Sequence, residues 1–314
     1  MRLALLAHDK FAPGSAKTAQ GAIVYAKNGW SGDEVVCVID RSKAGRDAGD
    51  FIDAARGIPI VASAAQALPL APDALVIGIA PVGGALPADW REDLEVALAA
   101  GVRVISGLHT ALRPAFPTHA SHIRDVRHEH PPQRITTGDG MYVDSLVVTL
   151  GGTDCNSGKM TTSVELVREA RRRGLTAAFV ATGQTGIMIG CDAGAPLDAL
   201  VSDFVAGATE ELVLQAAQKR PDLIVVEGQG TLTHPAYSGV TASLLHGSMA
   251  DVLVLADEPS RLVLRMPPGP VEFRKPSLAF ERDLNEMHMA ATTSAKVGAI
   301  ALMTPGLSTR EYED

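Results

Sequence analysis

The sequence predicts an α/β protein with two domains, a Rossmann-like N-terminal domain and a C-terminal parallel-sheet domain of the P-loop NTPase type. Short apolar or β-branched runs alternate with helical patterns in both halves of the chain, which is typical of βαβ units. Apolar residues make up 46% of the chain and aromatic residues only 4%, a balance usual for buried parallel strands. In the second half, one strand leads into a glycine-rich loop with a Gly-Lys pair. A length of 314 residues favours two domains.

The N-terminal domain is expected over residues 1–112. Gly101 suits the end of a helix expected over Arg91–Ala100, because glycine readily adopts the left-handed conformation that ends helices. The turn at Pro81–Gly84 follows a strand end, where open parallel sheets bind their ligands. The expected strands of this domain are Arg2–Ala7, Glu34–Ile39, Ile58–Ala62, Ala74–Ile79 and Val102–Ser106.

Residues 113–142 are expected to form a linker or strap between the domains. The apolar periodicity fails there, and Pro, His, Arg and Asp are frequent. Imidazoles are common metal ligands, so the histidines of this segment could form a metal site. However, no carboxylate or cysteine accompanies them at a spacing typical of metal-binding motifs. An interdomain strap, or part of a subunit contact, is therefore preferred to a metal site.

The C-terminal domain is expected over residues 143–314. Its expected helix over Lys159–Arg173 is followed by Gly174, a suitable helix end. Polar or glycine-rich residues follow the strands, at the edge where α/β proteins carry their sites. The expected strands are Leu146–Leu150, Thr176–Ala181, Asp222–Glu227, Val252–Leu255 and Val297–Leu302.

Composition excludes several classes of function. A net charge of −8 and a pI near 5.6 provide no basic field for nucleic acid or for an anionic membrane. No apolar run approaches the roughly 18 residues of a membrane span, and the run after Met1 is too short for a signal peptide. Three cysteines without paired spacing argue against disulfides or a zinc site. A cytoplasmic homo-oligomer acting on a small molecule is expected.

The loop from Gly152 to Lys159, Gly-Thr-Asp-Cys-Asn-Ser-Gly-Lys, predicts a phosphate cradle. Its backbone N–H groups, its lysine and the N-terminus of the following helix all favour an anion. Nucleotide hydrolases place a magnesium-binding Ser or Thr next, but this chain has Met160, a poor ligand for a hard cation. No metal is therefore expected. The expected phosphate-binding residues are Gly152, Thr153, Asn156, Ser157, Gly158, Lys159, Met160 and Thr161.

Cys155 lies inside this loop, close to a helix N-terminus and a lysine. Such surroundings lower the pKa of a thiol and suit a nucleophile. A small residue packed under the loop is the preferred interpretation, and an acetyl-cysteine intermediate is the alternative.

Two further strand ends carry candidate site residues. Glu227-Gly-Gln-Gly230 follows one strand and places a carboxylate near the loop in a parallel sheet, with His234 and Tyr237 as possible sources of a proton or hydrogen bond. Ala181–Gly190 follows another strand with closely spaced glycines, where the backbone can approach a ligand. Its Thr182, Gln184 and Thr185 offer neutral hydrogen-bonding groups for a carboxylate or amide.

These motifs resemble known proteins. The loop has five residues between its glycines where the ordinary pattern has four, and it is similar to the Gly-Thr-Asp-x-x-x-Gly-Lys-Thr loop of dethiobiotin synthetase. The whole chain resembles a bacterial family long catalogued as a domain of unknown function, which includes the D-glutamate N-acetyltransferases. The matching segments are Ala16–Ala19, Ile79–Gly84, Ser106–His109, Gly152–Thr161, Ala181–Gly190, Glu227–Gly230 and Leu245–Ser248.

The resemblance implies transfer of an acetyl group from acetyl-CoA to the amino group of D-glutamate, with the phosphates of CoA held by the loop. Such a transfer needs a base and a group that polarises the thioester carbonyl. The catalytic candidates are Glu227 or Asp154 as the base, and Lys159 with the loop amides for phosphate or the oxyanion. Basic residues would bind the substrate carboxylates, and the candidates are Arg261, Arg274 and Lys275.

Two alternatives stay open. One is an enzyme that activates a carboxylate with Mg-ATP, as dethiobiotin synthetase does; Thr161 would then replace Met160 as the metal ligand, although one helical step rotates it by about 100°. The other is a non-catalytic nucleotide or CoA sensor.

Overall fold

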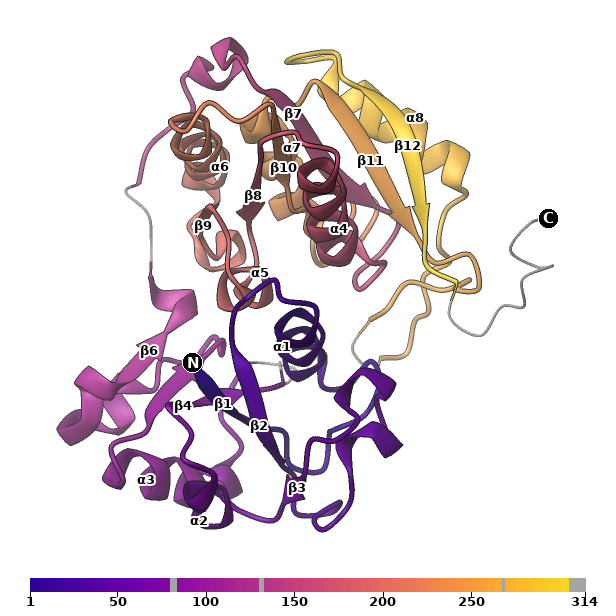
Figure 1. Cartoon of the computed structure of the whole chain (residues 1–314). Coiled ribbons are helices and arrows are strands. Elements are labelled where there is room, and N and C mark those ends of the chain that lie inside the picture. The colour runs from indigo at the N-terminus through magenta and orange to yellow at the C-terminus, as the bar shows by residue number, and fades with distance from the viewer. Residues whose placement is uncertain (80–83, 130–132, 267–268, 305–314) are drawn as a thin grey trace. The chain divides into compact units, whose positions relative to one another are not determined.

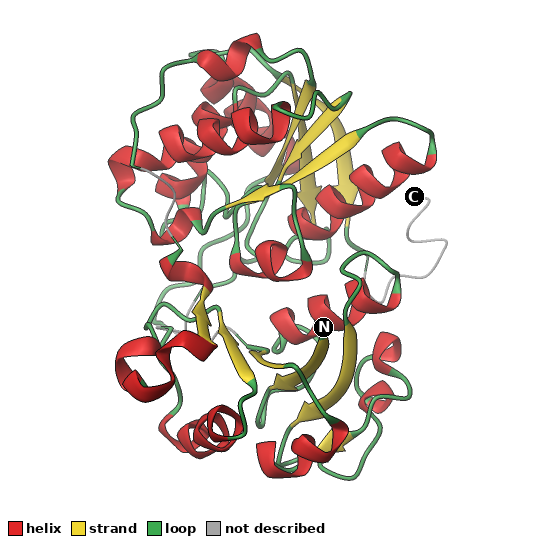
Figure 2. Ribbon diagram, turned by 60° about the vertical axis from the view of Figure 1, so that its left-hand side comes forward, coloured by secondary structure: helices red, strands yellow, loops and turns green. Residues whose placement is uncertain are grey.

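The structure is a computed structural model that describes residues 1–79, 84–129, 133–266 and 269–304. The chain divides into two compact units, Met1–Glu129 with Ile187–Gly190, and His130–Gly186 with Cys191–Asp314. Each unit contains a six-stranded parallel sheet (Figures 1 and 2). The predicted fold class is confirmed. Among the described residues, no helix has the length and apolar character needed to cross a bilayer.

The first unit has the strand order β3-β2-β1-β4-β5-β6 (Figure 1). The order reverses between β1 and β4, as in Rossmann-like sheets, and every pair is parallel. The strands are β1 Arg2–Leu6, β2 Glu34–Ile39, β3 Ile60–Val61, β4 Ala74–Ile77, β5 Arg103–Ser106 and β6 Ile123–Asp125, and the helices are α1 Lys17–Lys27, α2 Ala64–Ala67 and α3 Arg91–Ala99. Residues 81–83 of the expected ligand-binding turn lie outside the described residues.

The segment expected as a linker is divided between the two units. Residues 113–129 belong to the first unit and supply its edge strand β6. Buried Asp125 fastens this segment, because its carboxylate accepts hydrogen bonds from the main-chain N–H groups of Leu112 and Arg113 at 3.0 Å. β6 is only three residues long and lies among 3-10 turns, so it has no apolar periodicity to mark it: η5 Arg113–Ala115, η6 Pro117–His122 and η7 Val126–His128.

Residues 133–142 lie on the second unit, where Glu210 of helix α6 (Ser202–Ala217) holds them. Its buried carboxylate accepts hydrogen bonds from Thr137 N at 2.8 Å, Thr136 Oγ1 at 3.0 Å and Gly140 N at 3.2 Å. Burial raises the pKa of Glu210, but these hydrogen bonds outweigh that effect and keep the pKa below its usual value. Residues 133–142 are therefore an ordered part of the second unit.

The second unit has the strand order β12-β11-β7-β10-β8-β9, again entirely parallel (Figures 1 and 2). α4 packs against β7, β8 and β10, while α6 packs against α7 and α7 against α8. The strands are β7 Leu146–Gly152, β8 Ala177–Ala181, β9 Ala193–Gly194, β10 Leu223–Val226, β11 Val252–Asp257 and β12 Lys296–Leu302, and the other helices are α4 Lys159–Arg172, α7 Ser238–Ser248 and α8 Leu278–Met289. Helix α5, Gln184–Ile189, begins in the second unit and ends in the first.

Candidate phosphate-binding and catalytic site

The loop between β7 and α4 has the geometry of an anion cradle. Asn156 and Gly158 have φ angles of 55° and 98°, and these left-handed residues turn the loop so that α4 starts at Lys159. No side chain caps the N-terminus of α4 among the described residues, which leaves its first N–H groups to a ligand. Lys159 is buried, and its Nζ donates to Asp154 O at 2.7 Å.

Glu227 follows β10, the neighbour of β7, and the sequence prediction that it lies near the loop agrees with this geometry. A Cβ at position 228 would lie 1.5 Å from the carbonyl oxygen of Leu150 and 3.2 Å from Cδ of Lys159. Only glycine allows so close an approach. The Glu227-Gly228 turn is therefore pressed against both the strand and the lysine of the cradle.

The carboxylate of Glu227 contacts the turn that follows β8. Its Oε2 accepts hydrogen bonds from Thr182 N at 3.0 Å and Gly183 N at 3.2 Å, and Thr182 Oγ1 donates to Glu227 O at 2.9 Å. Two of the three polar residues expected to bind substrate, Thr182 and Thr185, are buried, whereas Gln184 is half-buried. The hydroxyl of Thr182 is therefore used to join two strand ends.

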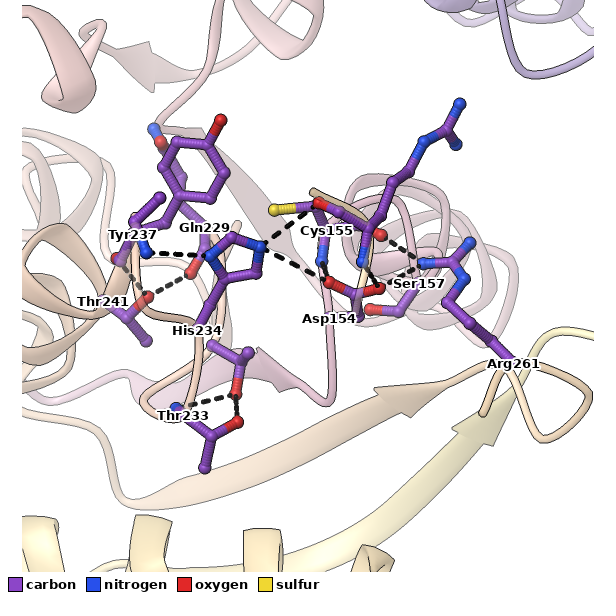
Figure 3. A network of polar contacts seen from close by, with 12 residues as sticks. Asp154, Cys155, Ser157, Gln229, Thr233, His234, Tyr237, Thr241 and Arg261 are labelled. Carbon is purple, nitrogen blue, oxygen red and sulfur yellow. Dashed lines mark hydrogen bonds and ion pairs between the residues drawn. The ribbon is translucent and has the colours of Figure 1, made fainter. Parts of the chain in front are cut away.

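Asp154 is almost fully buried, and several donors surround its carboxylate (Figure 3). Oδ1 accepts from Cys155 N at 2.7 Å, while Oδ2 accepts from Arg261 Nη1 at 2.9 Å and from Arg265 N at 2.8 Å. Both carboxylate oxygens are therefore occupied, by one guanidinium and two main-chain N–H groups. This geometry suits an anchor of the loop better than a proton acceptor.

Other buried contacts tie the loop to β11. Thr153, expected to bind phosphate, donates its hydroxyl to Asp257 at the end of β11, and both residues are buried. Lys275 donates to the same carboxylate at 2.8 Å and to Glu258 O at 2.8 Å. These bonds fix the mouth of the cradle. Lys275, one of the candidates for binding a substrate carboxylate, is therefore engaged in contacts within the protein.

The arginines expected to bind substrate carboxylates differ in their surroundings. Arg261 donates to Asp154, to Cys155 O at 2.6 Å and to Glu258, so its charge and donors are used within the protein. Arg274 is exposed, and its main chain pairs with Val263. Among the described residues, no hydrogen bond or ion pair joins the Arg274 side chain to the cradle.

Asp154, Cys155 and His234 bring three donor atoms within 4.8 Å of one another, which raises the question of a metal site. A metal-bound imidazole donates its other N–H to an acceptor. Here His234 Nδ1 instead accepts from Ala236 N at 3.1 Å, so the proton resides on Nε2, the atom 3.9 Å from Asp154 (Figure 3). Arg261 beside Asp154 further disfavours a cation. The donor set therefore does not suit a metal ion.

Glu281 in α8 also lies close to the loop, although the sequence analysis missed it. It is fully buried and accepts hydrogen bonds from Thr231 Oγ1 at 3.0 Å and from Thr233. Burial raises its pKa, and the charge of Lys159 opposes that rise. A lone glutamate in a helix carries no local signal of such a role.

Comparison with known proteins adds three findings. Residues 134–314 match the DUF1611 family, a domain of unknown function described as a P-loop domain, and residues 41–129 match DUF1611_N, described as a Rossmann-like domain. A curated D-glutamate N-acetyltransferase of Tritonibacter scottomollicae is 38% identical over 242 residues, covering 76% of this chain and 71% of that protein. A protein of the same name from Pseudoalteromonas sp. is 34% identical over 229 residues, covering 71% and 67%.

A solved structure gives the same fold. The crystal structure of a DUF1611 family protein from Anabaena variabilis superposes with a TM-score of 0.90 at 35% identity, and the match covers 99% of this chain and 90% of that one. The similarity therefore extends over both units.

Proposed function

This chain belongs to the DUF1611 family, and from that premise we propose that it transfers the acetyl group of acetyl-CoA to the amino group of D-glutamate. It is an enzyme of the acyltransferase class, as both curated relatives are by name. The observation that carries the proposal is the cradle between β7 and α4. It offers a buried lysine and an uncapped helix N-terminus, but Met160 where nucleotide hydrolases have a magnesium ligand.

CoA fits such a cradle because it has phosphate groups and needs no metal for thioester chemistry. In this proposal the N–H groups of the loop and Lys159 bind the pyrophosphate. Lys159 then acts on binding, so its loss should raise the KM for acetyl-CoA more than it lowers the turnover of bound substrate.

Acetyl transfer also requires that the ammonium group of the substrate lose a proton. The amine nitrogen then attacks the thioester carbon, the C–S bond breaks, and CoA leaves as a thiol after taking up a proton. Glu227 is the better candidate for the base, because Asp154 is already paired with Arg261. Loss of a positioned base lowers the rate by about 10²- to 10⁴-fold, which is the effect expected for Glu227→Gln.

The test follows free thiol in a mixture of protein, D-glutamate and acetyl-CoA with a metal chelator present. We expect thiol release that depends on D-glutamate and needs neither ATP nor magnesium. Phosphate release from ATP that requires magnesium, without thiol release, would instead support the carboxylate-activating alternative. Met160→Thr provides a matched variant: a gain of magnesium-dependent ATP binding would show that the methionine excludes that ligand.

A further inference from the structure

Arg265 is held at both ends of its main chain by residues that border the cradle. Its N–H donates to Asp154 Oδ2 at 2.8 Å, and its carbonyl oxygen lies 3.2 Å from His234 Nε2. Both partners are buried, with exposed fractions of 1% and 0%, whereas Arg265 itself is exposed. Two buried polar groups thus fix the backbone of one exposed cationic residue.

His234 acts in this arrangement as a fixed donor. Because Nδ1 accepts the N–H of Ala236 at 3.1 Å, the ring proton lies on Nε2 and points to Arg265 O. Tyr237 stacks on the imidazole with a centroid distance of 4.6 Å, which restricts rotation of the ring (Figure 3). In this arrangement the imidazole accepts a hydrogen bond at Nδ1 and donates one at Nε2. Its geometry suits the positioning of Arg265.

Arg265 also differs from the other cations at the loop. Lys159 donates to Asp154 O, and Arg261 donates to Asp154, Cys155 O and Glu258. Lys275 is joined to Asp257 at 2.8 Å. Each of these three is at least half-buried, whereas the Arg265 side chain is exposed. Arg265 presents an exposed guanidinium from a backbone that the same loop holds in place.

We propose that Arg265 binds an oxyanion of the ligand next to the one held in the cradle, and that Asp154 and His234 position it. A guanidinium binds carboxylate and phosphate oxygens through paired hydrogen bonds. If the proposed acetyl transfer is correct, on which this assignment of ligands rests, the oxyanion is either a carboxylate of D-glutamate or a phosphate of CoA. The interaction shared by both is a charged, two-pronged hydrogen bond.

Kinetics of Arg265→Ala separate these two sources. A hydrogen bond between charged groups contributes enough to change affinity by about 10- to 100-fold. A rise of this size in the KM for D-glutamate alone identifies the carboxylate, and a rise in the KM for acetyl-CoA alone identifies a phosphate. Added guanidinium ion should restore part of the lost affinity, which a purely structural residue would not permit. Unchanged values of both KM would overturn the proposal.

Arg172→Ala is the matched control. It removes the same charge from the same unit, but Arg172 is exposed at the far end of α4 and pairs only with Glu169 among the described residues. We expect both of its KM values to equal those of the unmodified protein. Arg265→Lys keeps the charge but loses the planar fork, so an intermediate KM is expected.

Direct binding keeps this inference separate from the proposed activity. Calorimetric titration with CoA and, separately, with D-glutamate needs no turnover. Weaker binding of either ligand by Arg265→Ala, with unchanged binding by Arg172→Ala, supports the anion contact even if no acetyl transfer occurs. Equal binding of both ligands by all three proteins would refute it.

The positioning role predicts a further difference between two variants of His234. His234→Phe keeps a ring that can stack on Tyr237 but removes the donor to Arg265, whereas His234→Gln keeps an N–H donor. We expect the phenylalanine variant to show the same selective rise in KM as Arg265→Ala, with kcat affected less, and the glutamine variant to recover part of the affinity. A fall in kcat without any change in KM for either variant would contradict this role.

Discussion

Replacing Asp154 with asparagine distinguishes two roles for this buried carboxylate, a general base and an anchor of the cradle. The three N–H groups that donate to it belong to Cys155, Arg261 and Arg265, at distances of 2.7–2.9 Å. Asparagine has the same shape but carries no charge and has only one acceptor oxygen. If that oxygen faces the two arginines, the amide nitrogen must face the N–H of Cys155.

The expected loss of stability follows from these contacts. One hydrogen bond is lost, and two are weakened because the acceptor is no longer charged. Since a hydrogen bond to a charged group contributes about 1.5–3 kcal/mol, the free energy of unfolding of the second unit should fall by about 3 kcal/mol. For a unit of this size, that change corresponds to a Tm lower by about 6–12 °C.

Scanning calorimetry of Asp154→Asn beside Arg172→Ala measures this effect, with acetyl transfer assayed on the same samples. Because Asp154 and Arg261 share a hydrogen bond, the double variant Asp154→Asn/Arg261→Gln should lose less stability than the sum of the two single variants. An unchanged Tm together with a large loss of kcat would refute the anchor role and assign Asp154 to proton transfer.

Three further predictions concern stability and reactivity. Burial lowers the pKa of His288 below 6.5, so the unfolded chain binds more protons than the folded chain as the pH falls through 6.5 toward the folded-state pKa. The free energy of unfolding should therefore decrease over that window. Measured by urea unfolding at pH 5.5 and 7.5, the difference in free energy of unfolding should be smaller for His288→Gln than for the unmodified protein. Gly228→Ala should prevent stable folding of the second unit, because the methyl group would lie 1.5 Å from Leu150 O; Gly183→Ala, whose methyl group meets only atoms at 3.7 Å or more, should keep most of the circular-dichroism signal. Burial raises the pKa of Cys37 to about 12, so iodoacetamide at pH 8 should modify this thiol only in denaturant, and modification of the native protein, detected by mass spectrometry, would contradict its burial.

The sequence alone determined the features that depend on local patterns. Apolar runs identified most strands of both sheets, and Gly158-Lys159 marked the start of α4 at the residue where the structure has it. The cradle was predictable because a strand, a glycine-rich loop and a helix are consecutive in the chain, so its shape needs no distant contact. For the same reason, the sequence showed that Met160 stands where nucleotide hydrolases have a magnesium-binding Ser or Thr.

Short elements without periodicity escaped prediction. β6 is three residues long, and its place at the edge of the sheet depends on pairing with β5. Glu210 holds residues 133–142 through the N–H groups of Thr137 and Gly140, which lie 73 and 70 residues earlier in the chain. Local sequence contains no sign of either contact, because both partners are brought together only when the units fold.

The contacts and the exposure of the charged residues around the cradle likewise depended on the tertiary structure. Arg261 and Arg265 lie in one loop, and the sequence offers no means of telling which side chain is half-buried against Asp154 and which is exposed. The difference depends on Asp154, which is 107 and 111 residues earlier in the chain. Its carboxylate accepts a hydrogen bond from the side chain of Arg261 and one from the main chain of Arg265. The sequence predicted an anion cradle because the donors of the loop are neighbours in the chain. Which residues anchor the loop depended on which distant donors reach the single buried carboxylate of Asp154.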